Sequence, residues 1–286
     1  MIASVAEHFK SYSPRTNEPP DGFFQEFAGN IIRKQFWPAV TWGREVFLDG
    51  EGWPARNESL FEWIDLAAAI DDARDRFVIV ELGAGFGRWI GSAACMIRQS
   101  RPDLAYRLLA VEADPTHFSW IAAYLLDNGV DPAAHKLIYG AACGRDGAID
   151  FVSGHPGDWY GQALASTFGA ETGFRHDDRP SAKTITVPGL SLETVTRGEG
   201  MIDLLHMDVQ NAEGEIIETS LDLLQARVRR AHIGTHSPAV EKTVREAFSS
   251  LGWTCAADFP ANSVSATPYG PIQFGDGVQS WRNPHL

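Results

Sequence analysis

The sequence predicts an α/β protein in which helices cover both faces of a mostly parallel, seven-stranded sheet, a doubly wound fold. From Phe77 onward, short apolar runs alternate with helix-like segments, as expected for parallel strands that are buried on both faces. The first apolar run ends in three alternate glycines, "VELGAGFGRW" over 80–89, a strand-to-helix turn of the Rossmann-like kind that often holds a nucleotide. Residues 1–74 lack the alternation and are rich in aromatic residues. We therefore expect an N-terminal extension over 1–74 and one α/β domain over 75–286.

The expected strands follow the apolar runs FVIVEL, RLLAVEAD, HKLIYGAAC, IDLLHMDV, RRAHIGTH, WTCAADF and IQFGDGVQSW. Helices are expected at WIGSAACMIRQS, at HFSWIAAYLLDNG, at EGEIIETSLDLLQ, and from Ser237-Pro238, as N-cap and first turn, to Ser250. AIDFVS and TITVPGL predict a hairpin around a long polar stretch. Residues 154–182 show no legible motif, and a loop of that length in a compact domain is usually functional or disordered.

The extension carries the stretches FFQEF, QFWPAVTWG and LFEWI and ends in a predicted helix from Glu58 to Ala73, with Asn57 as its N-cap. Aromatic side chains fill cores more often than they bind substrates. We therefore favour a packing role over one edge of the sheet. A substrate-site lid or a homodimer contact stays open as an alternative.

Charge and composition exclude several classes of protein. The formal net charge is −13, the wrong sign for a general nucleic-acid or anionic-membrane binder. No apolar run approaches the roughly 20 residues of a membrane helix, and the N-terminus lacks the continuous apolar core of a signal peptide. The three scattered cysteines fit reduced thiols. We expect a cytoplasmic protein that binds neither nucleic acid nor membrane.

The spacing of the glycine turn favours a nucleoside over a dinucleotide. A dinucleotide fingerprint places its third glycine five residues after the first, but that position, counted from Gly83, holds Arg88, and the third glycine is Gly87. Glu112 ends the second expected strand, where a carboxylate can accept hydrogen bonds from both ribose hydroxyls. NAD enzymes also bind the ribose through a carboxylate at this position, so an NAD(P)-dependent oxidoreductase stays an alternative. Glu81 could set the glycine loop, approach an ammonium group, or cap nearby backbone N–H groups.

Five segments resemble a known family. "VIVELGAGFGRW" and "LLAVEAD" resemble the first two motifs of class I S-adenosylmethionine-dependent methyltransferases. "LIYGAACGRDGAIDF", "VPGLSLETV" and "IDLLHMDVQNAEGEII" resemble the segments that mark the FkbM family within that class, and the resemblance covers about 77–280. Two departures stand out: His206 replaces the usual Lys, and Gln210-Asn211 replaces a Glu-Gly pair. The altered pair leaves a non-catalytic S-adenosylmethionine-binding protein as a third alternative.

The resemblance implies O-methylation of a hydroxyl on a small-molecule, sugar or polyketide-type acceptor in secondary metabolism, with S-adenosyl-L-methionine as the donor. Gly83, Gly85 and Gly87 would line its methionine part, Glu112 would hold the ribose, and the Ala141-Ala142 turn would lie against the adenine. The complete set of expected cofactor-binding residues is Glu81, Gly83, Ala84, Gly85, Gly87, Glu112, Ala113, Ala141, Ala142 and Asp208.

Methyl transfer to oxygen needs alignment and a base, and the expected catalytic residues are His236, Asp208 and His206. His236 is the first choice because histidine titrates near neutral pH, and Asp208 would orient it or act as base itself. Strand geometry puts His232 and His236 roughly 13 Å apart, too far for one metal. A magnesium ion, held by Asp208 and Glu213, is possible but not favoured.

The acceptor is expected to contact the polar segment HPGDWYGQAL. There Trp159 and Tyr160 could cover a sugar or macrolide face and exclude water. An ordinary surface loop is the competing interpretation.

Overall fold

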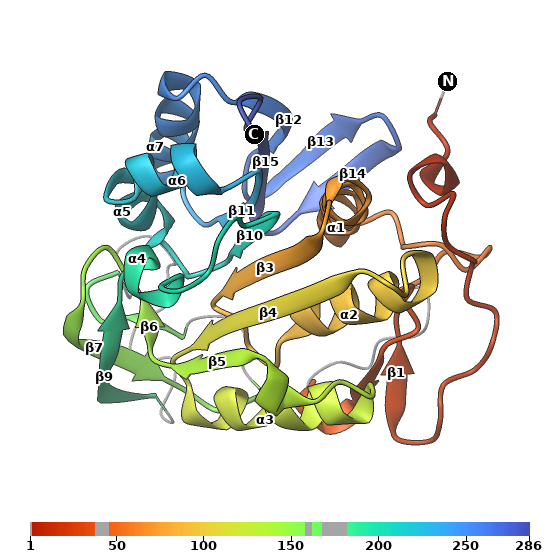
Figure 1. Cartoon of the computed structure of the whole chain (residues 1–286), viewed down its shortest axis with the longest axis horizontal. Helices are drawn as coiled ribbons and strands as arrows, with labels where there is room; N and C mark the ends of the chain where they lie inside the picture. Colours follow the sequence, from red (N-terminus) through yellow and green to blue (C-terminus); the bar gives the residue numbers. More distant parts are fainter. Residues whose placement is uncertain (1, 38–45, 158–161, 168–181) are drawn as a thin grey trace.

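The computed structural model describes residues 2–37, 46–157, 162–167 and 182–286 (Figure 1). Its main sheet has the strand order β12-β15-β11-β10-β3-β4-β5. The mutually parallel neighbours are β3 (Arg76–Leu82), β4 (Ala105–Glu112), β5 (Lys136–Tyr139), β10 (Leu204–Met207) and β11 (Arg230–Thr235). β15 (Gly277–Arg282) runs antiparallel between β11 and β12 (Thr254–Phe259). The predicted mostly parallel seven-stranded sheet is confirmed.

Successive residues of a strand point to opposite faces of the sheet. Because the residues on both faces of β3 are apolar, helices cover both faces. Phe77 and Ile79 of β3 pack in one core with α1 (Ser59–Asp72), α2 (Arg88–Ser100) and α3 (Pro115–Asp127). Val78 and Val80 pack in a second core with α4 (Leu192–Val195), α5 (Glu213–Glu218), α6 (Leu221–Arg227) and α7 (Pro238–Ser250). Figure 1 shows α5, α6 and α7 grouped apart from α2 and α3.

Local chemistry explains the helix ends. α7 begins as predicted, with the Ser237 hydroxyl accepting a hydrogen bond from the Val240 N–H and Pro238 in the first turn. Gly129 follows α3 with a φ of +70°, the conformation that glycine adopts without steric cost. The single helix expected over EGEIIETSLDLLQ is instead divided into α5 and α6 at Ser220, whose backbone is not helical. Short 3₁₀ turns occur at η1 (Val5–His8), η2 (Lys34–Phe36) and η4 (Pro132–Ala134).

Smaller sheets surround the main one. The predicted hairpin forms as β7 (Gly147–Ser153) and β9 (Lys183–Leu190), which pair antiparallel in a sheet with β6 (Ala141–Ala142) and β8 (Ala163–Leu164). The last expected strand, IQFGDGVQSW, is wrong as one unit. Its first part belongs to β14 (Gly270–Phe274), which pairs with β13 (Ser263–Thr267), and the GDG stretch turns the chain into β15.

The extension contributes α1 to one face of the sheet, and its earlier residues pack on α1 and α2 rather than on an edge of the sheet. Phe9 and Phe27 join the core of these helices, and their ring centroids lie 4.7 Å apart. β1 (Phe23–Gln25) and β2 (Ile31–Arg33) form a two-stranded sheet, and the Arg33 guanidinium pairs with Asp127 of α3 at 2.6 Å. No helix in the described ranges has the length and apolar character to cross a bilayer.

Candidate functional site

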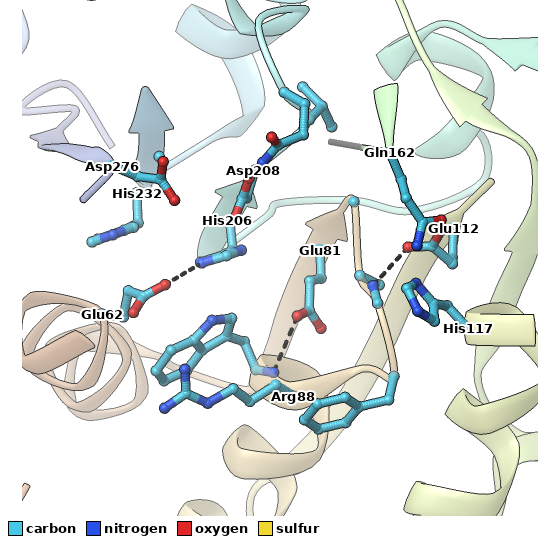
Figure 2. A pocket seen from close by; sticks show the side chains of 18 of the residues that line it. Glu62, Glu81, Arg88, Glu112, His117, Gln162, His206, Asp208, His232 and Asp276 are labelled. Carbon is cyan, nitrogen blue, oxygen red and sulfur yellow. Dashed lines mark hydrogen bonds and ion pairs between the residues drawn. The ribbon is translucent and has the colours of Figure 1, made fainter. Parts of the chain in front are cut away.

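A cavity of about 550 Å³ lies at the carboxyl ends of β3, β4, β10 and β11 (Figure 2), the place where doubly wound sheets bind ligands. Most of the expected cofactor residues line it: Glu81, Gly83, Ala84, Gly85, Glu112, Ala113, Ala141, Ala142 and Asp208. Gly87 is the exception, because it forms the N-cap of α2 with a φ of +83°. The cavity wall also includes residues of the N-terminal extension, among them Glu58 and Glu62. The extension therefore shapes the site as well as packing on the core.

The glycine turn brings β3 and β10 into close approach. Gly83 has a φ of +74°, and a Cβ atom at this position would lie 1.8 Å from the carbonyl oxygen of Asp208. No residue with a side chain fits there without moving the backbone. The turn is held on its other side by the N–H groups of Gly83 and Ala84, which both donate to the carbonyl of Val111 at 3.0 Å.

Glu112 is fixed at the end of β4 by backbone donors. Its Oε2 accepts from the Gly85 N–H and its Oε1 from the Asp114 N–H, both at 2.7 Å. Burial raises the pKa of Glu112 to about 7. Because each carboxylate oxygen has a second lone pair, the side chain can still accept hydrogen bonds from a ligand. Figure 2 shows His117 and Gln162 beside it at this end of the cavity.

Glu81 makes the capping contact that the sequence left as one of three alternatives. It accepts hydrogen bonds from the N–H groups of Trp89 at 3.1 Å and Ile90 at 3.0 Å, at the start of α2. Burial raises its pKa to about 8. The side chain thus sets the position of the helix that follows the glycine turn, and it also faces the cavity.

Arg88 belongs to the cavity wall. In the sequence it was considered only because it occupies the position of the third glycine of a dinucleotide fingerprint. Its guanidinium pairs with the buried carboxylate of Glu26 at 2.6 Å and lies 4.5 Å from the ring centre of Trp89 and 5.5 Å from that of Trp37. It is the only Lys or Arg among the described residues that line the cavity. Glu26 lies within FFQEF, so no spacing rule connects it with Arg88.

The position of His236 speaks against the prediction that it is the base. Its Nδ1 lies 3.0 Å from Oε1 of Glu213, and its Nε2 lies 3.2 Å from Oδ1 of Asp208. Although burial opposes a charge on the ring, these two carboxylates raise the pKa of His236 well above its ordinary value. The raised pKa favours the protonated ring, which is a poor general base. The two ring nitrogens of His236 contact the carboxylates of Glu213 and Asp208 and hold them in place.

Asp276 is one of the functional candidates that the sequence missed. It lies in the turn between β14 and β15, with Oδ1 3.7 Å from Nε2 of His236. Burial raises the pKa of Asp276 to about 7. Burial, the largest single effect, opposes ionisation of Asp208, but the hydrogen bond and the charge of His236, together with contributions from His206 and Gln210, outweigh it and lower the pKa of Asp208. The signal in the sequence was the GDG stretch, which marks a turn rather than a strand.

The expected magnesium pair of Asp208 and Glu213 is also corrected. Glu213 is fully buried on the Nδ1 side of His236 and accepts a hydrogen bond from the Val209 N–H at 3.0 Å. In the described chain, the residues whose potential ligand atoms gather around Asp208 are His236 and Asp276. Glu213 therefore positions the histidine and is not a partner of Asp208.

The altered Gln210-Asn211 pair keeps the turn that a glycine would form. Gln210 has a φ of +53° and Asn211 a φ of +75°, and asparagine is the residue after glycine that adopts this left-handed conformation most readily. The amide of Gln210 lies 3.1 Å from Oδ1 of Asp208 and 2.7 Å from Nε2 of His236. The pair thus forms a left-handed turn, and the Gln210 amide adds no further negative charge to the acidic cluster around Asp208.

His206 lies in a second cluster in the cavity wall. Its Nε2 is 3.1 Å from Oε1 of Glu62 in α1, and its ring is parallel to that of His232 with the centroids 5.5 Å apart. His232 and His236 belong to different clusters, as the strand geometry predicts. Trp159 and Tyr160 lie outside the described residues, but Gln162 and Leu164 of the same segment line the cavity.

Comparison with known proteins identifies the family. The methyltransferase FkbM domain matches residues 81–250, more than half of the chain. A curated protein of Jannaschia sp. (strain CCS1), whose name assigns it provisionally to the methyltransferases, is 26% identical over 269 residues, which are 93% of this chain and 94% of that protein.

Solved structures give weak global matches. A methyltransferase FkbM from Methylobacillus flagellatus KT is similar with a TM-score of 0.44 at 10% identity, over 79% of this chain and 55% of that one. A precorrin-6y C5,15-methyltransferase from Geobacter metallireducens GS-15 has a TM-score of 0.39 at 12% identity, over 76% of this chain and 85% of that one.

The matched family segment contains the glycine turn, Glu112, Asp208 at the end of β10 and the end of β11, and most residues that line the cavity lie within it. It is the family match, not the structural likeness, that favours a methyltransferase over the oxidoreductase alternative. This chain belongs to the FkbM family of S-adenosylmethionine-dependent methyltransferases.

Proposed function

We propose that this methyltransferase transfers the methyl group of S-adenosylmethionine to a hydroxyl oxygen of a small-molecule or glycan acceptor. The observation that carries the proposal is the division of the cavity into two chemically different ends. One end holds the glycine turn, Glu112 and the Ala141-Ala142 turn, and the other holds titratable side chains of β10, β11 and the Asp276 turn. The donor occupies the first end and the acceptor the second.

Asp276 replaces His236 as the proposed general base. Two carboxylates whose environments move their pKa values in opposite directions mark acid–base roles, and here the pKa of Asp276 is raised to about 7 while that of Asp208 is lowered. A base with a pKa near the working pH is the most effective. Asp208, held by the His236 cation at 3.2 Å, stays ionised and positions the acceptor or the donor.

The charge of the wall restricts the acceptor. Carboxylates line the cavity at both ends, and the single lining arginine, Arg88, is already paired with Glu26 at 2.6 Å. When no metal ion is bound, a phosphorylated or carboxylated acceptor would lie among these carboxylates without an unpaired lysine or arginine in the described cavity wall and would be repelled. We therefore expect a neutral or positively charged acceptor.

Binding of the demethylated donor, S-adenosylhomocysteine, tests the first part of the proposal, the position of the donor site. We expect a rise in Tm of the wild type and of Glu218→Ala, an exposed control of equal charge change, and no rise for Glu112→Ala. The absence of any shift at millimolar ligand would refute the donor site.

Turnover assays test the second part of the proposal, the transfer of the methyl group to a hydroxyl oxygen of the acceptor. With labelled S-adenosylmethionine and a panel of neutral polyols, glycosides and amino sugars, Asp276→Asn should lower kcat by about 10²–10⁴ with little change in the KM for the donor. Unchanged kcat in Asp276→Asn would exclude this residue as the base, and methylation confined to amines would exclude oxygen as the acceptor atom.

A further inference from the structure

Three potential metal ligands from three separate elements meet in the cavity wall. Glu62 comes from α1, His206 from β10 and His232 from β11, all three line the cavity, and their potential ligand atoms lie within 4.8 Å of one another. We propose that Glu62, His206 and His232 bind one divalent transition-metal ion, with open coordination positions toward the acceptor end of the cavity.

The spacing of the donor atoms fits one shared ion. Two ligand atoms that each lie about 2.1 Å from a zinc ion are separated by roughly 3–3.5 Å, and Oε1 of Glu62 lies 3.1 Å from Nε2 of His206. His206 and His232 are register partners on neighbouring strands, and their rings are parallel within 3°. The potential ligand atom of His232 lies within 4.8 Å of those of Glu62 and His206.

The surroundings of His232 orient it as a ligand. Its Nδ1 donates to Oδ2 of Asp65 at 2.7 Å, and the Ser280 hydroxyl donates to the same oxygen. A histidine that gives one ring N–H to a carboxylate presents the other nitrogen, made more basic, to a metal ion. Among the described residues, Nε2 of His232 makes no hydrogen bond. Figure 2 shows His232, His206 and Glu62 along one side of the cavity.

The donor set indicates the class of ion. Two imidazoles and one carboxylate suit Zn²⁺ or Fe²⁺, whereas Mg²⁺ and Ca²⁺ prefer oxygen ligands. The other group, Asp208, His236 and Asp276, offers one imidazole and two carboxylates, a donor set with less nitrogen that suits these transition-metal ions less well. Three protein ligands leave positions open for an acceptor oxygen, whose pKa a bound cation lowers. That role rests on the proposed function, but binding of the ion does not.

Zinc binding to the full chain, measured by isothermal titration after dialysis against a chelator, tests the site. We expect one ion per chain, confirmed by elemental analysis. Glu62→Gln and His232→Gln should weaken binding at least 100-fold, and Asp65→Asn, which changes only the support of His232, by about 10–100-fold. Co²⁺ in place of Zn²⁺ should give the visible absorption bands of a site with nitrogen and oxygen ligands, and these bands should disappear in Glu62→Gln.

Two controls locate the ion. Asp276→Asn in the other group and His285→Gln, an exposed histidine, should bind zinc as the wild type does. Zinc binding that survives in Glu62→Gln and His232→Gln, or that is lost in Asp276→Asn, overturns the proposal, as does the absence of binding at millimolar zinc. Each variant is also tested for its Tm shift with S-adenosylhomocysteine, so that a misfolded chain is recognised. A wild type that binds zinc through these residues but does not respond to S-adenosylhomocysteine would keep the metal site and refute the donor.

Discussion

Replacing Gly83 by alanine should separate the turn after β3 from the end of β10. A Cβ atom at Gly83 would lie 1.8 Å from the carbonyl oxygen of Asp208, and because this contact is with backbone, no side-chain rotation relieves it. Two other glycines with similar φ values provide matched controls. At Gly87, with φ +83°, the nearest atoms are side-chain methyl groups 3.1 Å and 3.3 Å away, and at Gly129, with φ +70°, nothing lies within 4 Å.

All three variants lose stability because alanine adopts a left-handed backbone less readily than glycine. They differ in how far the backbone must also move to make room for the new Cβ atom. A left-handed backbone costs an L-residue about 1–2 kcal/mol, so Gly129→Ala should lose only that amount of stability. In Gly83→Ala the turn must also move, which endangers the hydrogen bonds from Gly83 N–H to Val111 and from Asp208 N–H to Leu82, both 3.0 Å long. Each is worth about 1 kcal/mol net. We expect a loss of about 3–4 kcal/mol for Gly83→Ala, with Gly87→Ala in between.

Thermal and urea unfolding of the three variants measure these differences. For chains of this size, each kcal/mol lowers Tm by about 2–4 °C. Gly83→Ala should also lose the response to S-adenosylhomocysteine, because the turn and Asp208 both line the cavity, whereas Gly129→Ala should keep it. If Gly83→Ala is no less stable than Gly129→Ala, the turn and β10 do not approach each other as described.

Two further predictions concern buried charges. Arg88→Ala should cost about 3–5 kcal/mol because it leaves the carboxylate of Glu26, 1% exposed, without its charged partner. Arg245→Ala, which breaks the partly exposed pair with Asp258, should cost about 1 kcal/mol in the same urea unfolding experiment, and equal losses would contradict the burial argument. Burial raises the pKa of Glu81 to about 8 from an ordinary 4.5, so its contribution to stability is complete below about pH 4 and is lost as the pH rises through about 8. The fall in Tm between about pH 6 and pH 9 should therefore be smaller in Glu81→Gln than in the wild type, and an equal fall would show that Glu81 titrates normally.

Local patterns were enough to predict the sheet, the glycine turn and the carboxylate that follows β4. Apolar runs and helix caps are determined by neighbouring residues, and the carboxyl ends of parallel strands meet at one edge whatever the details of the fold. For this reason Glu81, Glu112 and Asp208 were predicted at the cavity and lie there. The surroundings of His236 were not predictable, because Glu213 and Asp208 reach its two ring nitrogens from different directions.

The residues that the sequence missed come from segments that are distant in the chain. Glu62 precedes its partner His206 by 144 positions, and no periodicity relates a helix of the extension to a particular strand of the sheet. Asp276 was placed within a strand because the apolar residues on either side of the GDG stretch continued a strand-like pattern. In both cases tertiary packing, not local propensity, decided the position.

The helix α1 shows why the extension is more than packing. It is buried almost all round, as a core helix should be, yet Asp65 is only 7% exposed and Glu62 faces the cavity. Burying a carboxylate or an imidazole costs free energy that its partners only offset, and apolar side chains of similar size often stabilise a core at least as well. Stability alone therefore does not account for two carboxylates and two histidines, Glu62, Asp65, His206 and His232, connected across α1, β10 and β11. Three of them, Glu62, His206 and His232, line the cavity, and Asp65 supports His232 from behind, which is the arrangement that the proposed metal site requires.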